Sequence, residues 1–509
     1  MSGAHVVWFK RDLRVVDHAP LRDAALAGRV LCLAMIEPSA WAQPDAARQH
    51  LHFQLECLRQ LYRDLQALGL KLHLRVGEAT EVLTALHQDL GIAALYSHEE
   101  TGNDWSYARD RAVAAWCRQH RVHWHEQAQF GVVRGLRQRK AWQTRWEMTM
   151  GASQVPTLAP HAAHQAEWSP APQRVPSADA LGLGAAEPPT RQRGGRAAGL
   201  AVLHEFLSER SAQYRGGISS PLKAPSACSR LSPYLAWGCL SMREVVQATR
   251  QRLADPALPA HQAKGLKAFT SRLYWHCHFI QKLESEPEIE WRNMHRGYDG
   301  LREDDFNDEH FAALTQGRTG WPLVDACVAM LRETGWLNFR MRAMLVSVAA
   351  YPLWLHWRPV GLWLAQQFLD YEPGIHWSQL QMQSGTTGIN TTRVYNPIKQ
   401  ARDHDPHGHF VRRWLPAMRR VPDTWLFEPW RMPANVQAEY GVTVGQDIAL
   451  PLVDLEAATR TAKQRLYARR GQSAVRQAKV AIIERHASRA PQSTRRRSPR
   501  SDNAQSSLW

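Results

Sequence analysis

A change of hydrophobic periodicity along the chain is the strongest constraint on its fold. In residues 1–135, short β-rich runs alternate with longer amphipathic stretches, and the β-rich runs are HVVWF, RVLCLAMI, KLHLRV, IAALYS and RVHWHE. Such alternation implies right-handed crossovers and a parallel, doubly wound sheet. No G-x-G-x-x-G motif or P-loop accompanies it, so neither standard nucleotide fingerprint is present. We predict an α/β domain over 1–135 that binds ligands beyond the carboxyl ends of its strands.

The remainder of the chain has a different pattern. Residues 199–482 contain long helical patterns such as GLKAFTSRLYWHCHFIQKLE and no strand alternation. The intervening residues 136–198 become rich in Pro, Ala, Gly and Ser, which is typical of an inter-domain linker. Residues 483–509 include RAPQSTRRRSPR, a basic tail with too little apolar surface to order itself. We predict an α/β domain, a linker, a larger all-α domain and a disordered tail.

The net charge points to a polyanionic partner. Lys and Arg outnumber Asp and Glu by 63 to 47, which gives a formal charge of +16. A balance this basic concentrates polyanions near the surface, so DNA is the leading partner class. The alternative is a charge that serves solubility together with the basic tail.

Cysteine usage and hydropathy favour a cytoplasmic protein. The seven cysteines are scattered and include no C-x-x-C pair, so the sequence predicts a reducing compartment and no metal site. No apolar run approaches the roughly 18 residues of a membrane span, and the N-terminus lacks the apolar core of a secretion signal. We expect no membrane contact and a monomer.

Two local features suggest a bound cofactor. The chain has 21 tryptophans; each one alone favours core packing, but together they suggest aromatic rings beside a cofactor. In CSRLSPYLAWGCLS, residues 228–241, Ser229 and Ser232 could cradle a pyrophosphate, or Ser232 could simply cap a helix. Similarly, Arg342 and Asp370 could be a structural ion pair or could hold the polar edge of a ring system.

Four long motifs occur in a fixed order along the chain. They are VVWFKRDLRVVDHAPL, SRLSPYLAWGCLS, TGWPLVDACVAMLRETGWLNFRMR and YNPIKQARDHDPHGHFVRRWLP. Together they resemble the photolyase/cryptochrome family over nearly all of residues 4–430. The resemblance implies an antenna-type α/β domain, a helical domain that binds FAD, and light-driven repair of pyrimidine dimers in UV-damaged DNA by a deoxyribodipyrimidine photo-lyase.

The resemblance also implies which residues contact FAD. Cys228 stands where the family commonly has Thr, and Arg342 and Asp370 match an ion pair beside the isoalloxazine ring. The full set of expected FAD-binding residues is Tyr214, Cys228, Ser229, Arg230, Leu231, Ser232, Arg272, Arg342, Asp370, Tyr371 and Glu372.

The stretch GIHWSQLQMQSG, residues 374–385, should run along the reactive edge of the flavin. His376 falls where photolyases usually carry an Asn that faces flavin N5. Trp357 matches the middle tryptophan of the family's electron relay, whereas Leu380, or Ser378 in an alternative register, occupies the flavin-proximal position. We predict that Trp377 substitutes in the relay or that photoreduction takes another route.

The expected lesion pocket departs from that of repair enzymes. Trp275 matches the tryptophan that stacks on the dimer, but Arg272 replaces a glutamate and so exchanges an acceptor for a donor. Met382 replaces a second stacking tryptophan. Arg412 and Arg413 are expected on the basic rim that binds DNA phosphates, although helix-surface arginines are often only solvated.

Three functions are compatible with these residues. Light-driven DNA repair is favoured by Trp275 and the basic charge, and a cryptochrome-type blue-light photoreceptor without repair is favoured by Arg272 and by Phe339, which replaces the family's Asn. A basic nucleic-acid-binding protein with a vestigial flavin site is disfavoured by the intact flavin positions. A second, antenna chromophore of unknown identity is possible near Glu99, Trp105 and Arg109.

Overall fold

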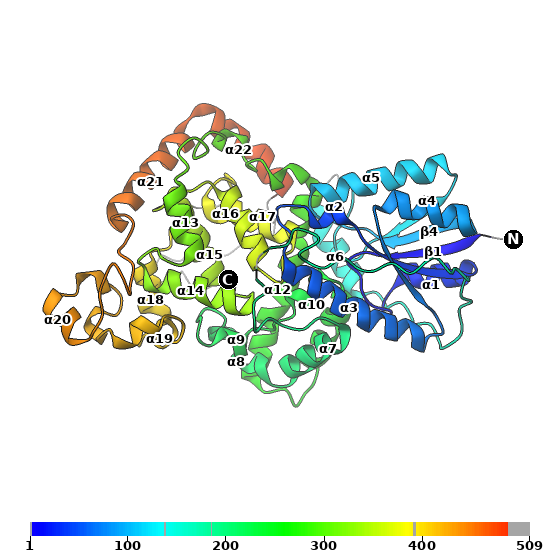
Figure 1. Cartoon of the computed structure of the whole chain (residues 1–509), viewed down its shortest axis with the longest axis horizontal. Helices are drawn as coiled ribbons and strands as arrows, with labels where there is room; N and C mark the ends of the chain where they lie inside the picture. Colours follow the sequence, from blue (N-terminus) through cyan, green and yellow to red (C-terminus); the bar gives the residue numbers. More distant parts are fainter. Residues whose placement is uncertain (1–2, 137–138, 185, 390–392, 487–509) are drawn as a thin grey trace.

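The computed structural model of the chain describes residues 3–136, 139–184, 186–389 and 393–486. Figure 1 shows a sheet domain built from the N-terminal residues, packed against a larger assembly of helices. The predicted fold class, an α/β domain followed by an all-α domain, is therefore confirmed. Among the described residues, no helix has the length and apolar character needed to cross a bilayer.

The sheet has five parallel strands in the order β3-β2-β1-β4-β5. The strands are β1 (Ala4–Phe9), β2 (Val30–Ile36), β3 (Leu72–Val76), β4 (Ile92–His98) and β5 (His123–Gln127). In the centre of the sheet, Val7 pairs with Cys32 on one side and with Tyr96 on the other. The order of strands reverses between β1 and β4, and in doubly wound sheets a crevice for ligands opens at such a point.

Helices cover both faces of the sheet, and the side chains of β1 point alternately to these two faces. Val7 and Phe9 belong to the buried cluster of the α1 and α3 face, whereas Val6 and Trp8 belong to that of the α4 and α5 face. This period of two is expected of a strand buried on both sides. The helices of this domain are α1 (Ala19–Ala27), α2 (Pro38–Trp41), α3 (Arg48–Ala67), α4 (Ala79–Leu90) and α5 (Asp104–Gln119).

The segment predicted as a linker is more structured than expected. It contains α6 (Trp142–Gly151), whose buried Trp142, Trp146 and Met150 face the core. Their spacing of four residues is a helical signal, which the Pro-rich and Gly-rich text that follows obscured. After α6, the described residues up to α7 form no helix and no strand longer than an isolated bridge.

Helices build the second domain. They are α7 (Arg196–Glu205), α8 (Ser211–Gly217), α9 (Ala224–Ala227), α10 (Ser232–Ala236), α11 (Met242–Leu253), α12 (Ala260–Ser285), α13 (Asp308–Gln316), α14 (Pro322–Thr334), α15 (Phe339–Ala350), α16 (Trp357–Gln367), α17 (Pro373–Ser384), α18 (Pro397–His404), α19 (His409–Trp414), α20 (Ala434–Glu439), α21 (Leu455–Gly471) and α22 (Ser473–His486). Helix α22 thus continues into the segment predicted as a tail, and residues 487–509 lie outside the described residues.

Helix α12 runs through the centre of the helical domain and contacts α8 and α17 (Figure 1). Two glycines allow these close approaches. A Cβ at Gly265 would lie 1.9 Å from the Ser211 carbonyl oxygen, and a Cβ at Gly374 would lie 2.6 Å from the Cα of Ile280. Helix α17 also packs on α15 and α16, so residues far apart in the sequence meet around α12 and α17.

Candidate functional site

An ion pair joins the first turn of α15 to the loop before α17. The Arg342 Nη2 lies 3.0 Å from Asp370 Oδ2, and the Ser232 hydroxyl donates to the same oxygen at 2.6 Å. Burial acts to raise the pKa of Asp370, but Arg342 and Ser232 outweigh it and hold that pKa below its usual value. Asp370 is therefore a buried carboxylate. Because the Ser232 side chain makes no capping bond to α10, the interpretation of Ser232 as a simple helix cap is wrong.

The loop before α10 presents an unusual backbone next to this pair. Arg230 has a φ of +59°, a conformation that is uncommon for a non-glycine residue. Its guanidinium lies 4.0 Å from the centre of the Trp336 ring, and burial lowers the pKa of Arg230 to about 10. Arg210 donates to the carbonyl oxygens of Cys228 and Ser229 at 2.5 and 3.3 Å. The loop is thus fixed by side chains rather than by regular secondary structure.

Tyr214 and Arg272 face each other between α8 and α12. Tyr214 is buried against the rings of Phe206 and Phe269. Burial raises the pKa of Tyr214, and a hydrogen bond with Arg272 acts in the opposite direction. Cys228, whose pKa burial raises to about 12, interacts electrostatically with Tyr214 and stays a neutral thiol. The expected FAD residues of α8, α12 and the loop before α10 are therefore neighbours.

Asp370 and the helices on either side of the ion pair, α15 and α17, carry buried polar atoms that have no hydrogen-bond partner among the described residues. They are Asp370 Oδ1, Asn338 Oδ1, Arg340 Nε and Gln379 Oε1, on α15, on α17 or just before these helices. A buried polar group without a partner costs about 1–3 kcal/mol, so native structures rarely leave such groups unpaired. A ligand whose polar edge lies against Asp370 would supply the partner that its second carboxylate oxygen lacks. The residues present therefore fit the polar edge of a flavin.

Arg11 connects the sheet domain to this site. It follows β1, donates from Nε to the Ala236 carbonyl and from Nη2 to the Tyr371 carbonyl, each at 3.0 Å, and lies 3.7 Å from the Glu372 carboxylate. Burial raises the pKa of Glu372 to about 7, against the opposing effect of Arg11. Sequence reasoning missed Arg11, although its place after the first strand was a usable signal.

His376 is a neutral histidine with a fixed tautomer. Its Nε2 lies 2.8 Å from the Gly361 carbonyl oxygen, so this nitrogen carries the proton and Nδ1 is free to accept. Burial lowers the pKa of His376 to about 4. The ring contacts Tyr371 at 5.1 Å and Trp377 at 4.9 Å between centres. His376 can therefore accept a hydrogen bond near neutral pH but carries no charge there.

The two expected relay tryptophans are in contact. The Trp357 and Trp377 rings are 5.9 Å apart between centres, at 70° to each other, and both are fully buried. The Trp357 indole donates to the Asn293 side-chain oxygen at 2.8 Å. Leu380, which has no redox-active ring, packs with Trp377 against Gly361 of α16. The ring of Trp377 is thus in direct contact with that of Trp357, and its part in the relay stays a prediction.

The expected lesion residues are only partly brought together. Trp275 is half-buried on α12 and stacks on Phe279 at 5.7 Å, with Arg272 one turn earlier on the same helix. Met382 is half-buried on α17, which packs against α12. Trp275, Arg272 and Met382 therefore belong to two adjoining helices.

Arg412 and Arg413 lie elsewhere, on α19, which packs on α14. Arg412 donates to the His407 and Val421 carbonyls and pairs with Asp423 at 2.6 Å. Arg413 lies over the Trp414 ring at 5.5 Å. The structure does not group these arginines with Trp275, because both lie on α19 rather than on α12 or α17. Arg412 is in addition held by His407, Val421 and Asp423.

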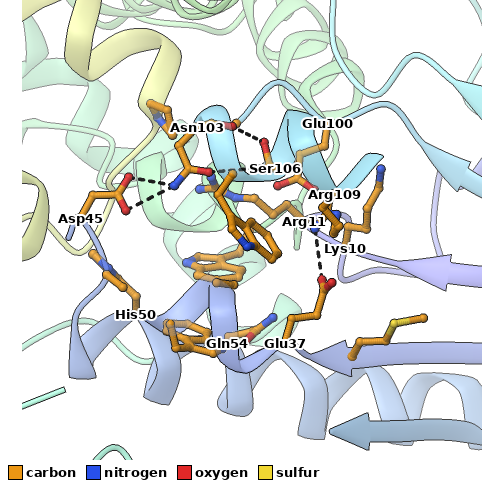
Figure 2. Close-up of a pocket in the computed structure, with 18 of the residues that line it drawn as sticks. Lys10, Arg11, Glu37, Asp45, His50, Gln54, Glu100, Asn103, Ser106 and Arg109 are labelled. Atoms are coloured by element: carbon orange, nitrogen blue, oxygen red, sulfur yellow. Dashed lines mark hydrogen bonds and ion pairs between the residues drawn. The ribbon is translucent and has the colours of Figure 1, made fainter. Parts of the chain in front are cut away.

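A second candidate site is a pocket at the carboxyl ends of β1 and β2, closed by residues of the helical domain (Figure 2). Trp105 and Arg109 line it as expected, whereas Glu99 is not among its lining residues. The residues that sequence reasoning missed are Trp8, Lys10, Arg11, Glu37, Trp41, Asp45, His50, Gln54, Glu100, Asn103, Ser106 and Trp237. Lys10 and Arg11 directly follow β1 and Glu37 directly follows β2, and for these three residues this position was the available signal.

The charges of this pocket are largely compensated within it. Arg109 contacts Glu37, Glu100 and Asp110 at 3.3, 2.7 and 2.8 Å. Lys10 pairs with Asp110 at 3.2 Å. Burial raises the pKa of Glu37 to about 7, although Arg109 opposes this. With its tryptophans, the pocket suits a planar polar ring better than a multiply charged anion.

The buried polar residues around Asp370, Arg342 and Ser232 form what we call the flavin cradle. The fold and this cradle define a two-domain protein that can bind a flavin between helices and a second ligand at the carboxyl ends of the strands. Residues 269–468 match the family described as the FAD binding domain of DNA photolyase, and residues 5–134 match the DNA photolyase family. The chain belongs to the photolyase/cryptochrome family, and its helical domain is an FAD-binding domain of the photolyase type.

Individual relatives carry both kinds of name. The chain is 28% identical over 495 residues to a cryptochrome DASH of Gloeobacter violaceus, covering 88% of this chain and 93% of the relative. It is 27% identical over 470 residues to a deoxyribodipyrimidine photo-lyase of Vibrio cholerae, covering 84% and 93%. A crystal structure of a bacterial class III photolyase from Agrobacterium tumefaciens shares the fold, with a TM-score of 0.79, 24% identity and coverage of 93% and 98%.

Proposed function

We propose that the chain is a light-driven, FAD-dependent DNA repair enzyme, a deoxyribodipyrimidine photo-lyase with an altered lesion pocket. The observation that carries this proposal is the buried carboxylate of Asp370. It has Arg342 and Ser232 on one oxygen and no partner among the described residues on the other. Reduced FAD would supply the electron that splits the dimer, and the protein would supply position and electrostatics.

The residues around the cradle divide the work of holding FAD. Asp370 accepts from the polar edge of the ring, and Arg342 keeps this carboxylate ionised. Glu372 would flank that edge and the neutral His376 would offer an acceptor beside it, whereas the Tyr371 hydroxyl is bonded to Asp45 of the sheet domain. Tyr214, Arg272 and the loop residues Cys228, Ser229, Arg230, Leu231 and Ser232 contact the phosphates and sugar chain.

The lesion would enter beside α12 and α17. The half-buried Trp275 would stack on a base flipped from the duplex, a contact worth about 1–3 kcal/mol per base. Arg272 and Met382 complete the pocket and distinguish it from one lined by a carboxylate and a second tryptophan. The charge of +16 favours DNA binding, and Arg412 and Arg413 remain candidates for phosphate contacts outside this pocket.

A second chromophore is proposed for the pocket in Figure 2. Its tryptophans can stack on a planar ring, and its carboxylates can accept from ring N–H groups. Trp105 and Arg109 were expected at such a site. A pigment bound here would transfer excitation to FAD in the adjacent domain.

A blue-light photoreceptor without repair is the alternative. Arg272 favours it, because a guanidinium donates where repair enzymes have a carboxylate acceptor. Met382 favours it as well, since a thioether cannot stack on a base as an indole does. In this case light would change the flavin and a protein surface, and no DNA bond would be broken.

Illumination of the purified protein on damaged DNA separates the two functions. We expect a yellow protein whose reduced form, under blue light, restores bases in DNA that carries defined cyclobutane or 6-4 dimers. The restored bases would be counted, with a dark sample as the control. A colourless folded protein would exclude both flavin functions, and a flavin that photoreduces without repair of either lesion would support the photoreceptor.

A further inference from the structure

The hydroxyl of Tyr371 is bonded to a carboxylate of the other domain. Tyr371 lies between Asp370 and Glu372, and its hydroxyl donates to Asp45 Oδ2 at 2.7 Å. Asp45 is only 4% exposed and also accepts from the Asn103 amide at 3.1 Å, a contact drawn in Figure 2. Tyr371 and Asp45 both line the pocket between the domains. A phenol and a proton acceptor are thus held together beside the flavin cradle.

Aromatic contacts connect this phenol to the tryptophan pair. The Tyr371 ring is 5.1 Å from the ring of His376, which is 4.9 Å from that of Trp377, which in turn is 5.9 Å from that of Trp357. Burial and Asp45 raise the pKa of Tyr371, whereas the indole of Trp377 acts to lower it. The ring of His376 thus connects those of Tyr371 and Trp377, and the four rings form a continuous path.

Only the phenol end of this path has a carboxylate to accept a proton. In the described part of the chain, no hydrogen bond joins the indole of Trp357 or Trp377 to a carboxylate, and Trp357 donates to the neutral side chain of Asn293. An oxidised indole can keep its proton, so its electron returns easily. An oxidised phenol is a strong acid and releases its proton to a base within about 2.6–3.2 Å. Asp45 satisfies this distance.

We propose that Tyr371 is the terminal electron donor of this path and that Asp45 receives its proton. The inference rests on the proposed function, because the electron acceptor is light-excited FAD, which gains one electron. Tyr371 loses that electron through Trp377 and loses the proton of its hydroxyl to Asp45 Oδ2, becoming a neutral phenoxyl radical. The O–H bond of Tyr371 breaks and a new O–H bond forms on Asp45. A thiolate reductant in solution then supplies one electron and becomes a thiyl radical, while Asp45 returns its proton to the Tyr371 oxygen, so that the phenol and the carboxylate are both restored.

Tyr107 provides a matched control. Its hydroxyl is bonded to Glu284 Oε2 at 3.0 Å, and burial raises its pKa as in Tyr371. Among the described residues, no ring contact joins Tyr107 to His376 or Trp377. It therefore shares the phenol–carboxylate chemistry but not the path.

The test is electron paramagnetic resonance of the FAD-loaded full chain, frozen under blue light and prepared with ordinary or ring-deuterated tyrosine. The radical yield is divided by the bound flavin of each sample. We expect a tyrosyl radical, identified by its change on deuteration, in the unaltered protein and in Tyr107→Phe. It should be lost in Tyr371→Phe and strongly reduced in Asp45→Asn, which keeps the phenol but removes the proton acceptor. Formation of the radical in the unaltered protein should slow in deuterated water.

Persistence of the tyrosyl radical in Tyr371→Phe would overturn the inference, as would a radical in the unaltered protein that deuteration of tyrosine leaves unchanged. The radical forms without DNA. A protein that forms it but repairs no lesion would therefore contradict the proposed repair function and still support this inference. A protein that repairs lesions without forming the radical would support the proposed repair function and contradict this inference. A protein that binds no flavin would overturn both.

Discussion

Replacement of Asp370 by alanine is expected to lower the affinity for FAD by about tenfold to a hundredfold. The variant removes the acceptor of Arg342 and Ser232 and leaves a guanidinium whose side chain is only 23% exposed. A hydrogen bond to a charged group contributes about 1.5–3 kcal/mol, and this is the interaction that the flavin loses when the Asp370 carboxylate is removed. Each 1.4 kcal/mol corresponds to about tenfold in affinity.

Asp370→Asn should show an intermediate loss, because it keeps the shape and one acceptor but removes the charge. Flavin content after gel filtration and titration of flavin fluorescence would measure the affinity, and unfolding of the flavin-free proteins would report any loss of fold. Asp423→Ala is the control, since it breaks the pair with Arg412 in which the Asp423 side chain is 87% exposed. Exposed pairs contribute at most about 1 kcal/mol. Equal flavin affinity in Asp370→Ala and the control would contradict the role of Asp370.

The fold was largely predictable because its signals are local. Alternating β-rich and amphipathic runs predict the parallel sheet, and each strand overlaps one of the predicted β-rich runs. Helix α6 was missed because its pattern of Trp142, Trp146 and Met150 is short and borders a Pro-rich stretch. The end of α22 at His486 was missed for a similar reason, since basic composition outweighed a short helical pattern.

The site was predictable only where long motifs carry it. Arg342 and Asp370 were paired through motif positions, and their contact at 3.0 Å agrees with that pairing. The hydrogen bond between Asp45 and Tyr371 joins residues 326 positions apart, and no periodicity or local spacing predicts such a contact. The expected role of Arg412 in binding DNA was harder to judge. A basic chain has many arginines, and the sequence does not show which of them are already paired with a carboxylate.

Trp377→Phe is expected to slow photoreduction of the bound flavin by at least about tenfold, equivalent to about 1.4 kcal/mol in activation free energy. Trp377 is the ring that contacts both Trp357 and His376, and Leu380 offers no substitute. Phenylalanine retains the ring packing but is far harder to oxidise than an indole. The rate would be followed from the loss of flavin absorbance under constant blue light with a thiol reductant.

Two further variants decide whether the effect comes from redox chemistry or from packing. Trp377→Tyr should restore part of the rate, because a phenol can be oxidised and a phenyl ring cannot. Trp321→Phe should photoreduce normally, although Trp321 is equally buried in the same cluster, because in the described part of the chain its ring contacts neither Trp357 nor Trp377. Unchanged photoreduction in Trp377→Phe would exclude Trp377 from the relay, and equal slowing in Trp321→Phe would assign the effect to loosened packing. A rate that Trp377→Tyr restores and Trp377→Phe does not would mean that the first electron donor is Trp377, a neighbour on the same helix of the expected position at Leu380 or Ser378.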